Sequence, residues 1–267
     1  MRTIAHLSDL HFGAAIPEIT AALLEELSAK SPSLVVISGD LTQRARRNQF
    51  IAARAFLDQL TSPYLVIPGN HDVPLYNVAR RFGSPLGRYQ QLIRRDLDPT
   101  YEDAELFVAG VNTARSLVWK AGRISAAQIE GLRHRLATAG DRFKVVVTHH
   151  PFIPSPMNAG ASIELGRAAE ALTILEEAEV DLLLAGHLHH GYTGDTRSYF
   201  ASARRSIIAV QAGTAISHRV RHEPNAYNWI TLDRDTIAVE VRAWADGVFN
   251  ENLTSRFALR GAAWVVA

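Results

Sequence analysis

The chain has 267 residues, of which 47% are hydrophobic and 21% are charged, and its formal net charge is +1. This composition is typical of an ordinary globular protein with a sizeable apolar core, and the balanced charge gives no sign of a nucleic-acid partner. The chain contains no Cys, so disulfides and thiolate metal sites are excluded, and any metal must be held by nitrogen and oxygen atoms.

The first residues of the chain contain no apolar segment long enough for a secretory signal, and no apolar run approaches the length of a membrane span. A soluble, cytoplasmic protein without a transmembrane segment is therefore expected. Peripheral contact with a membrane stays open.

The first predicted strand covers Ile4–Leu7 and is followed at once by Asp9 and His11. Because side chains alternate along an extended backbone, residues two apart point to the same side, which is how two ligands reach one ion. Pro17 then begins a predicted helix, and its apolar residues recur at helical spacing. A D-x-H pair by itself is weak evidence for a site.

Two further apolar strands each end in a polar residue of ligand type. Leu34–Ile37 is followed by Asp40, and Tyr64–Ile67 is followed by a turn and then by Asn70, His71 and Asp72. An amide oxygen, an imidazole and a carboxylate in a row suit a metal site better than a core.

Residues from about 74 to 103 are Arg-rich and are predicted to form an irregular insertion, either a functional lid or a solvated loop. The next predicted strand, Leu106–Val111, leads to Asn112 and Arg115. Ser125 and Gln128 then form a capping-box pattern that predicts the start of a helix.

Histidines follow the last two buried strands of this half of the chain. Phe143–Val147 leads to His149 and His150, and residues 180–185 lead to His187, His189 and His190, with a helix predicted between them from about 162 to 177. Because His187 and His189 are two residues apart, they are expected to face one side.

Residues from about 206 to 267 show a two-residue period that predicts an antiparallel strand region. No repeat, low-complexity segment or convincing linker interrupts the chain. A single domain covering residues 1–267 is therefore expected, with an α/β fold.

Functional groups of α/β proteins gather outside the carboxyl ends of parallel strands, so the five polar motifs are expected to meet in one crevice. Seven side chains of ligand type then converge there, more than one cation can use. Two cations can use them if a carboxylate is shared, at a spacing of about 3.5–4 Å that suits phosphoryl transfer. The seven residues are Asp9, His11, Asp40, Asn70, His149, His187 and His189.

The motifs D-x-H, G-D, G-N-H-D, H-H-P and G-H-x-H in this order resemble those of the calcineurin-like metallophosphoesterase superfamily. The resemblance implies a four-layer α/β/β/α sandwich with two divalent metal ions, whose identity stays open among Mn, Fe, Zn, Co and Ni. It also implies that His71 meets the phosphate and protonates the leaving group, and that Asp72 orients His71. The implied ligands are Asp9, His11 and His189 for one metal, and Asn70, His149 and His187 for the other, with Asp40 bridging them.

The sequence is most similar to the branch of cyclic-nucleotide and glycerophosphodiester phosphodiesterases, which implies attack of a metal-bound hydroxide on a small phosphodiester. One alternative is a pyrophosphate hydrolase acting on a nucleotide-linked lipid precursor such as UDP-diacylglucosamine, with the Arg-rich segment against lipid headgroups. The other is a non-catalytic, metal-depleted scaffold, against which the intact ligand set argues. The oligomeric state is left open.

Four residues near the predicted strand ends are candidates for contact with substrate phosphate: Arg44, Asn112, Arg115 and His218. Each could equally be solvated. His218 belongs to a polar cluster with Arg219 and Arg221, which follows Gly213 and indicates a substrate-facing loop. His150 and His190 directly follow candidate ligands, so packing or an outer hydrogen bond is expected of them.

Overall fold

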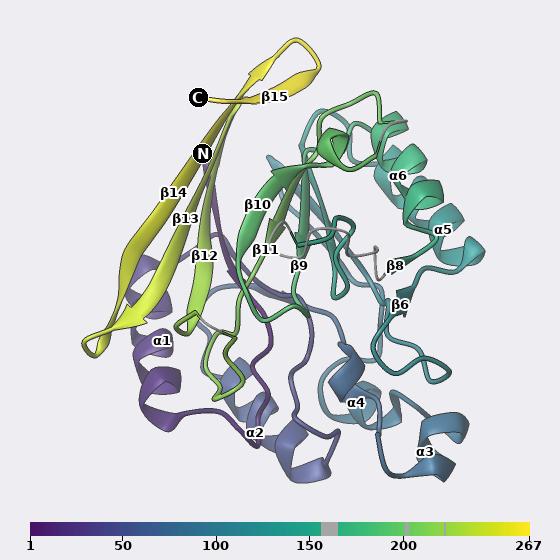
Figure 1. Cartoon of the computed structure of the whole chain (residues 1–267), viewed down its shortest axis with the longest axis vertical. Helices are drawn as coiled ribbons and strands as arrows, with labels where there is room; N and C mark the ends of the chain where they lie inside the picture. The colour runs from purple at the N-terminus through teal and green to yellow at the C-terminus, as the bar shows by residue number, and fades with distance from the viewer. Residues whose placement is uncertain (156–164, 201–202, 222) are drawn as a thin grey trace.

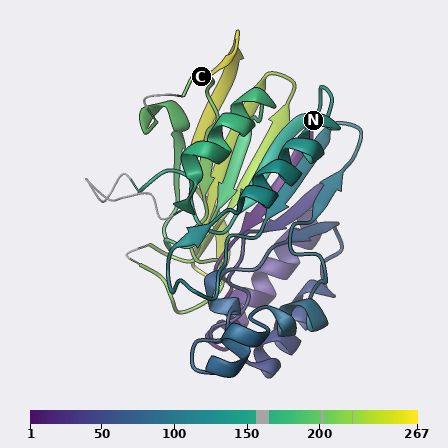
Figure 2. The same cartoon turned by 90° about the vertical axis from the view of Figure 1, so that its right-hand side faces the viewer.

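Two β-sheets packed face to face form the centre of the molecule, and helices cover both outer faces (Figures 1 and 2). The computed structural model describes residues 1–155, 165–200, 203–221 and 223–267. The predicted α/β/β/α sandwich is confirmed.

The first sheet has seven strands in the order β15-β14-β13-β12-β1-β2-β3. In chain order its strands are β1 (Arg2–Leu7), β2 (Leu34–Ile37), β3 (Tyr64–Val66), β12 (Ala226–Asp233), β13 (Thr236–Ala245), β14 (Val248–Arg260) and β15 (Ala263–Val266). β1, β2 and β3 are parallel, whereas β12 to β15 form an antiparallel meander that joins the edge of β1.

The second sheet has six strands in the order β10-β11-β9-β7-β5-β4. Its strands are β4 (Thr100–Glu102), β5 (Leu106–Val111), β7 (Phe143–Thr148), β9 (Leu182–Ala185), β10 (Tyr192–Asp195) and β11 (Ile208–Gln211). A short parallel pair, β6 (Gly122–Arg123) with β8 (Leu165–Gly166), lies apart from both sheets.

Three apolar cores separate the four layers. Ile4, Val36, Val145 and Leu184 belong to the core between the two sheets. A second core packs the first sheet against α1 (Pro17–Lys30) and α2 (Arg47–Leu57), and a third packs the second sheet against α5 (Ala126–Ala137) and α6 (Ala168–Glu177). Because strands β2 and β9 are buried on both faces, their apolar runs are continuous rather than alternating. We propose on this basis that residues 1–267 form one domain.

Two helix starts show how local sequence acts. α5 begins after Ser125, whose Oγ accepts a hydrogen bond from the backbone N–H of Gln128 at 3.2 Å, so the predicted capping box is confirmed. α6 begins at Ala168, later than predicted, because Leu165 and Gly166 form β8. Residues 162–164 of the predicted helix lie outside the described residues.

The Arg-rich segment is not an irregular, solvated insertion. It contains α3 (Val78–Gly83), α4 (Gly87–Leu92) and β4, and Tyr89 of α4 is fully buried with its hydroxyl donating to the carbonyl of Val66 at 3.1 Å. The expectation of an irregular insertion is therefore wrong, because its apolar residues pack on the core beside α2.

The predicted antiparallel region is correct for β12 to β15 and wrong for β11, which pairs parallel with β9. The second sheet also contains β10, which pairs antiparallel with β11 and ends at Asp195. None of the helices in the described part of the chain has both the length and the apolar character needed to cross a bilayer.

Candidate metal centre

The polar motifs lie just beyond the carboxyl ends of β1, β2, β3, β7 and β9, where the two sheets meet. Five of the seven expected ligands have a left-handed backbone: φ is 55° at Asp9, 46° at His11, 55° at Asp40, 79° at His187 and 62° at His189. Each such residue costs on the order of 1–3 kcal/mol, and this kind of strain is concentrated at functional sites. The chain therefore turns sharply after each strand and directs these side chains into a shared space.

Glycine at position 69 allows the backbones after β2 and β3 to come close together. A Cβ atom there would lie 2.1 Å from Oδ1 of Asp40 and 2.3 Å from its backbone nitrogen. The turn before Asn70 is therefore built around the carboxylate of Asp40, which also accepts a 2.8 Å hydrogen bond from the backbone N–H of His71.

Asp9, His11 and His189 form the first group of ligand atoms, and all three side chains are buried. Oδ1 of Asp9 lies 3.5 Å from Nε2 of His11 and 3.5 Å from Nε2 of His189. Oδ1 of Asp9 and Nε2 of His11 are buried atoms with no hydrogen-bond partner. Buried polar atoms are nearly always satisfied, so these atoms fit the ligand set of a cation.

Hydrogen bonds on the far side of these rings determine which nitrogen faces inward. Nδ1 of His189 lies 2.8 Å from Oγ1 of Thr214, which itself donates to the carbonyl of Arg219 and so accepts the proton of His189. Nδ1 of His11 lies 3.5 Å from the carbonyl oxygen of Thr42. In the neutral rings Nε2 is therefore the lone-pair atom, as a metal ligand requires.

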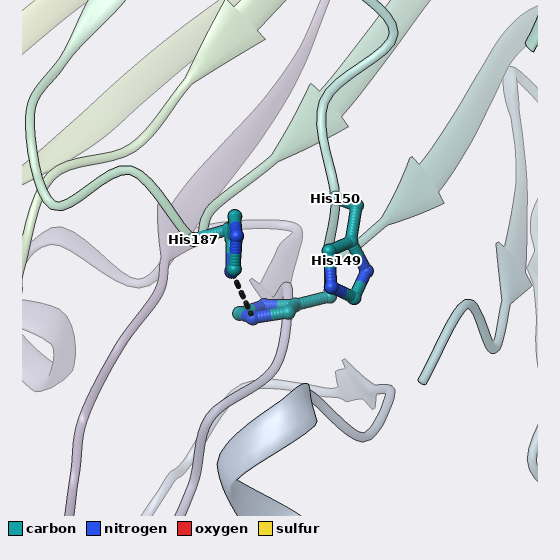
Figure 3. Close-up of side chains that lie close together, drawn as sticks. All are labelled: His149, His150 and His187. Atoms are coloured by element: carbon teal, nitrogen blue, oxygen red, sulfur yellow. Dashed lines mark hydrogen bonds between the residues drawn. The ribbon is translucent and has the colours of Figure 1, made fainter. Parts of the chain in front are cut away.

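Asn70, His149 and His187 form the second group. Oδ1 of Asn70 lies 3.0 Å from Nε2 of His149 and 3.0 Å from Nδ1 of His187. The two ring nitrogens are 3.3 Å apart, as the dashed line in Figure 3 marks.

His149 shows why this second group suits a cation. Its Nδ1 donates to the carbonyl of Ser38 at 2.8 Å, so Nε2 of the neutral ring presents a lone pair to two acceptor oxygens, one on Asn70 and one on Asp40. Lone pairs that face one another at this distance repel unless a proton or a metal ion lies between them.

The carboxylate of Asp40 lies between the two groups. Its Oδ1 is 3.4 Å from Nε2 of His149, and its Oδ2 is 3.7 Å from Nε2 of His11 and has no hydrogen-bond partner. One oxygen therefore faces each group, which is the arrangement that a bridging carboxylate needs.

The close packing of these side chains shifts the pKa values of His149 and Asp40. Burial alone would lower the pKa of His149, but the charge and hydrogen bond of Asp40, the charge of Asp9 and the hydrogen bond to Ser38 together outweigh burial and raise that pKa to about 9. Burial would raise the pKa of Asp40, yet His149 and His71 hold it well below its ordinary value. Asp40 is thus a buried anion whose charge favours a bound cation beside it.

Comparison with known proteins agrees with this geometry. Residues 2–191 match the family described as calcineurin-like phosphoesterase. The chain belongs to the calcineurin-like phosphoesterase family. The two groups of ligand atoms and the carboxylate between them all lie within the matched residues.

Several curated relatives within the family are named phosphodiesterases. The chain is 28% identical over 57% of its length to a glycerophosphodiester phosphodiesterase, GpdQ, of Enterobacter lignolyticus, and the match spans 57% of that protein, less than two thirds of it. It is 28% identical to the 3′,5′-cyclic adenosine monophosphate phosphodiesterase CpdA of Escherichia coli, over 83% of this chain and 78% of that protein.

Solved structures show the same fold. A purple acid phosphatase from yellow lupin superposes with a TM-score of 0.72 at 14% identity, covering 95% of this chain and 53% of that chain. GAP50 of Plasmodium, described as the anchor in the inner membrane complex, gives a TM-score of 0.59 at 14% identity, covering 98% and 90%.

His71 lies beside the first group, with its ring edge against that of His11 at 4.8 Å between centroids. Its Nδ1 donates to the carbonyl of Gln43 at 2.9 Å, and burial lowers its pKa. The expectation that Asp72 orients His71 is wrong. The carboxylate of Asp72 accepts from the backbone N–H groups of Gly69, Leu41 and Thr42 and from the Thr42 hydroxyl, and so fixes the loop that carries Asp40.

His150 shares the cluster drawn in Figure 3 but is not positioned as a ligand. Its Nε2 donates to the carbonyl of Lys120 at 2.8 Å, and its Nδ1 lies 2.7 Å from the hydroxyl of Thr113. With both nitrogens used, His150 holds the loop after β5 against the centre. His190 is likewise engaged outside the centre, with Ser155 and the carbonyl of Leu188.

Asn112 and Arg115 stay predictions as substrate contacts, and in this structure both side chains bind groups of the protein itself. Oδ1 of Asn112 caps its own turn by accepting from the N–H of Ala114 at 2.9 Å. The guanidinium of Arg115 donates to the carbonyls of Asn112 and Ala114 and to Gln128, so it fixes the start of α5.

Arg44 and His218 stay predictions as substrate contacts. Arg44 is half-buried and lies over the ring of Tyr76 at 5.9 Å, whereas the side chain of His218 is exposed. Within the polar cluster after Gly213, the residue that approaches the carboxylates is Arg219, which interacts electrostatically with Asp40 and Asp9.

Exposed apolar side chains form a rim next to Asn70. The carbonyl of Trp119 accepts from Nδ2 of Asn70 at 3.5 Å, while the indole is 63% exposed. Arg81, only 3% exposed, holds this rim together by donating to the carbonyls of Pro74 and Val118 and lying under Trp119. This apolar rim consists of the exposed apolar residues of two segments, 74–83 and 117–119: Tyr76, Val78, Phe82, Leu117 and Trp119.

Proposed function

We propose that this protein is a dinuclear metal-dependent phosphodiesterase that hydrolyses a small phosphodiester. The observation that carries the proposal is the Asp40 carboxylate with one oxygen facing each of two groups of ligand atoms, while its Oδ2, Oδ1 of Asp9 and Nε2 of His11 are buried and have no hydrogen-bond partner. In this proposal Asp9, His11 and His189 hold one ion, and Asn70, His149 and His187 hold the other. The names of the curated relatives support a diester substrate.

Two bound dications would neutralise the charge of the phosphate and lower the pKa of a water molecule that attacks it. The residues of the chain supply the rest. Hydrolysis breaks one P–O ester bond, gives the hydroxyl of water to phosphorus, and gives a proton to the departing alcohol. Because Nδ1–H of His71 is committed to the carbonyl of Gln43, Nε2 is the atom of His71 that exchanges a proton with the departing alcohol. Burial lowers the pKa of His71 and favours the neutral ring, so Nε2 must first take up the proton that it then gives to the alcohol.

Asp72 acts on Asp40 rather than on substrate. Its four hydrogen bonds fix the backbone on either side of the bridging carboxylate, so its role in this proposal is positioning. Burial, with the nearby charge of Asp40 adding to it, raises the pKa of Asp72 to about 6.

Chelation followed by reconstitution tests the proposal. Stripped protein should not cleave bis(p-nitrophenyl) phosphate, and added Mn²⁺ or one of Fe²⁺, Zn²⁺, Co²⁺ and Ni²⁺ should restore cleavage. The reconstituted enzyme should then be compared on cyclic nucleotides, glycerophosphodiesters, nucleoside-diphosphate lipids and monoesters. Absence of cleavage at every metal loading contradicts the proposal, and less than about one ion per purified chain favours a scaffold role.

The apolar rim favours a second candidate, a pyrophosphate hydrolase acting on a nucleotide-linked lipid precursor. Exposed Trp119 and Phe82 beside a phosphate-processing centre would suit a substrate with an apolar part. Pelleting with anionic liposomes separates the two candidates, since the small-diester enzyme is expected to stay in the supernatant.

A further inference from the structure

Arg219 lies in the loop between β11 and β12 and carries a cation without a partner. The Nε atom of Arg219 is buried and has no hydrogen-bond acceptor. Among the described residues, no carboxylate forms an ion pair with the guanidinium. Arg242, by contrast, pairs with both Glu26 and Glu240. A partly buried guanidinium without an acceptor is costly unless a ligand supplies one.

Arg219 lies close to the metal centre, on the loop whose Thr214 bonds to His189 and whose Ser217 bonds to the carbonyl of Asp9. Its charge is within electrostatic range of Asp40 and Asp9 and of the imidazoles of His71 and His189. Arg219 is therefore near the first group of ligand atoms and the proposed proton donor.

Two hydroxyls that hold ligand residues also hold the backbone of Arg219. Thr214 accepts from His189 and donates to the carbonyl of Arg219 at 3.0 Å. Ser217 donates to the carbonyl of Asp9 at 3.4 Å and accepts from the N–H of Arg219 at 3.4 Å. The position of this arginine is thus tied to the position of the ligands.

Other cations surround Arg219. Arg44 and Arg221 lie within electrostatic range of it, and neither forms an ion pair with a described carboxylate. An arginine cluster of this kind attracts an anionic ligand, and a guanidinium fork matches two phosphate oxygens.

We propose that Arg219 binds a non-bridging oxygen of the substrate phosphate held at the metal centre. The inference rests on the proposed function, because it takes the phosphate group as the ligand of that centre. Arg44 and Arg221 add positive charge that draws the anion in, and Arg219 makes the direct contact. A purely structural arginine would instead stabilise the ligand carboxylates.

The probe is inorganic phosphate, and calorimetry measures its affinity for protein reconstituted with Mn²⁺. Arg219→Ala should weaken phosphate binding by about tenfold to a hundredfold with an unchanged metal content. Arg219→Lys keeps the positive charge but loses the forked guanidinium, so its phosphate affinity should lie between those of the wild type and Arg219→Ala. Arg133→Ala, an exposed arginine of α5 paired with Glu177, is the control and should bind phosphate as the wild type does.

Kinetics on bis(p-nitrophenyl) phosphate add a second readout. For Arg219→Ala, kcat/KM should fall by a similar factor, and millimolar guanidinium should restore part of it because it supplies the missing donor. Unchanged phosphate affinity, or loss of metal in both Arg219 variants, overturns the inference. A wild type that binds phosphate but cleaves no ester contradicts the proposed function alone.

Discussion

The Nδ1 atom of His189 lies 2.8 Å from Oγ1 of Thr214, and this contact leaves Nε2 of His189 facing Asp9. Thr214 therefore sets the tautomer of a candidate ligand without being one. Groups that hold a ligand imidazole in this way commonly contribute about tenfold to a hundredfold to metal affinity.

Thr214→Val should accordingly weaken binding of Mn²⁺ or Zn²⁺ by about tenfold to a hundredfold, measured by competition with a chelating dye. Thr196→Val is the matched control. Thr196 is also fully buried, but its hydroxyl has no hydrogen-bond partner, so its removal should leave metal affinity unchanged. Equal affinities for the two variants would contradict the proposed role of Thr214.

Asp40→Asn should reduce the metal content from about two ions per chain to about one or fewer, because an amide offers one neutral oxygen in place of two charged ones. Elemental analysis after gel filtration measures this directly. Asp58→Asn, at an exposed carboxylate paired with Arg54, is the control and should keep the wild-type content. A variant at position 40 that retains both ions would refute the bridging role.

The fold and the meeting of the candidate ligands could be predicted because both follow from local sequence. Each apolar run ends two or three residues before a candidate ligand, and the rule that such ends gather at one edge of a parallel sheet places Asp9, Asp40 and His149 together. The order of strands, by contrast, depends on pairings between distant segments. β11 looks like the strands that follow it, yet it pairs with β9.

The partners of polar side chains were the least predictable part. Asp72 follows His71 in sequence, but its carboxylate binds the loop of Leu41 and Thr42, some thirty residues earlier. Arg81 reads as a solvated charge in an Arg-rich segment, yet it is buried because its guanidinium donates to the carbonyls of Pro74 and Val118 and stacks on the ring of Trp119. The sequence shows which side chains are polar, but their hydrogen-bond partners lie far away in the sequence and are known only from the folded structure.

Gly69→Ala should disrupt the centre, since the added Cβ would lie 2.1 Å from Oδ1 of Asp40. We expect a lower melting temperature and loss of tight metal binding, measured by calorimetry with and without Mn²⁺. The matched control is Gly131→Ala in α5, where no atom lies within 4 Å of the new Cβ. This second substitution should stabilise the protein by about 0.5–1 kcal/mol through helix propensity. A neutral result at position 69 would show that Asp40 and its turn can move apart freely.

His6 should make the metal-free protein sensitive to acid. Burial lowers the pKa of His6 from 6.5 to about 3, despite the opposing charge of Asp9, and its ring lies between Ser38 and Asn228. The unfolded chain therefore binds more protons than the folded chain between pH 6.5 and pH 3. The stability contributed by the neutral ring is complete above pH 6.5 and is lost as the pH falls toward 3, by about 2 kcal/mol at pH 5.

Replacing His6 by Gln isolates this contribution, because Gln can still bond to Ser38 and Asn228 but does not titrate. Urea unfolding in EDTA at pH 7 and pH 5 should show a smaller loss of stability for His6→Gln than for the wild type, with the difference near about 2 kcal/mol. The other buried histidines titrate in both proteins and cancel in the comparison. His134→Gln, at a position that is exposed in the folded chain, should leave the pH dependence unchanged. Parallel curves for the wild type and His6→Gln would mean that the buried ring accepts its proton without unfolding the strands around it.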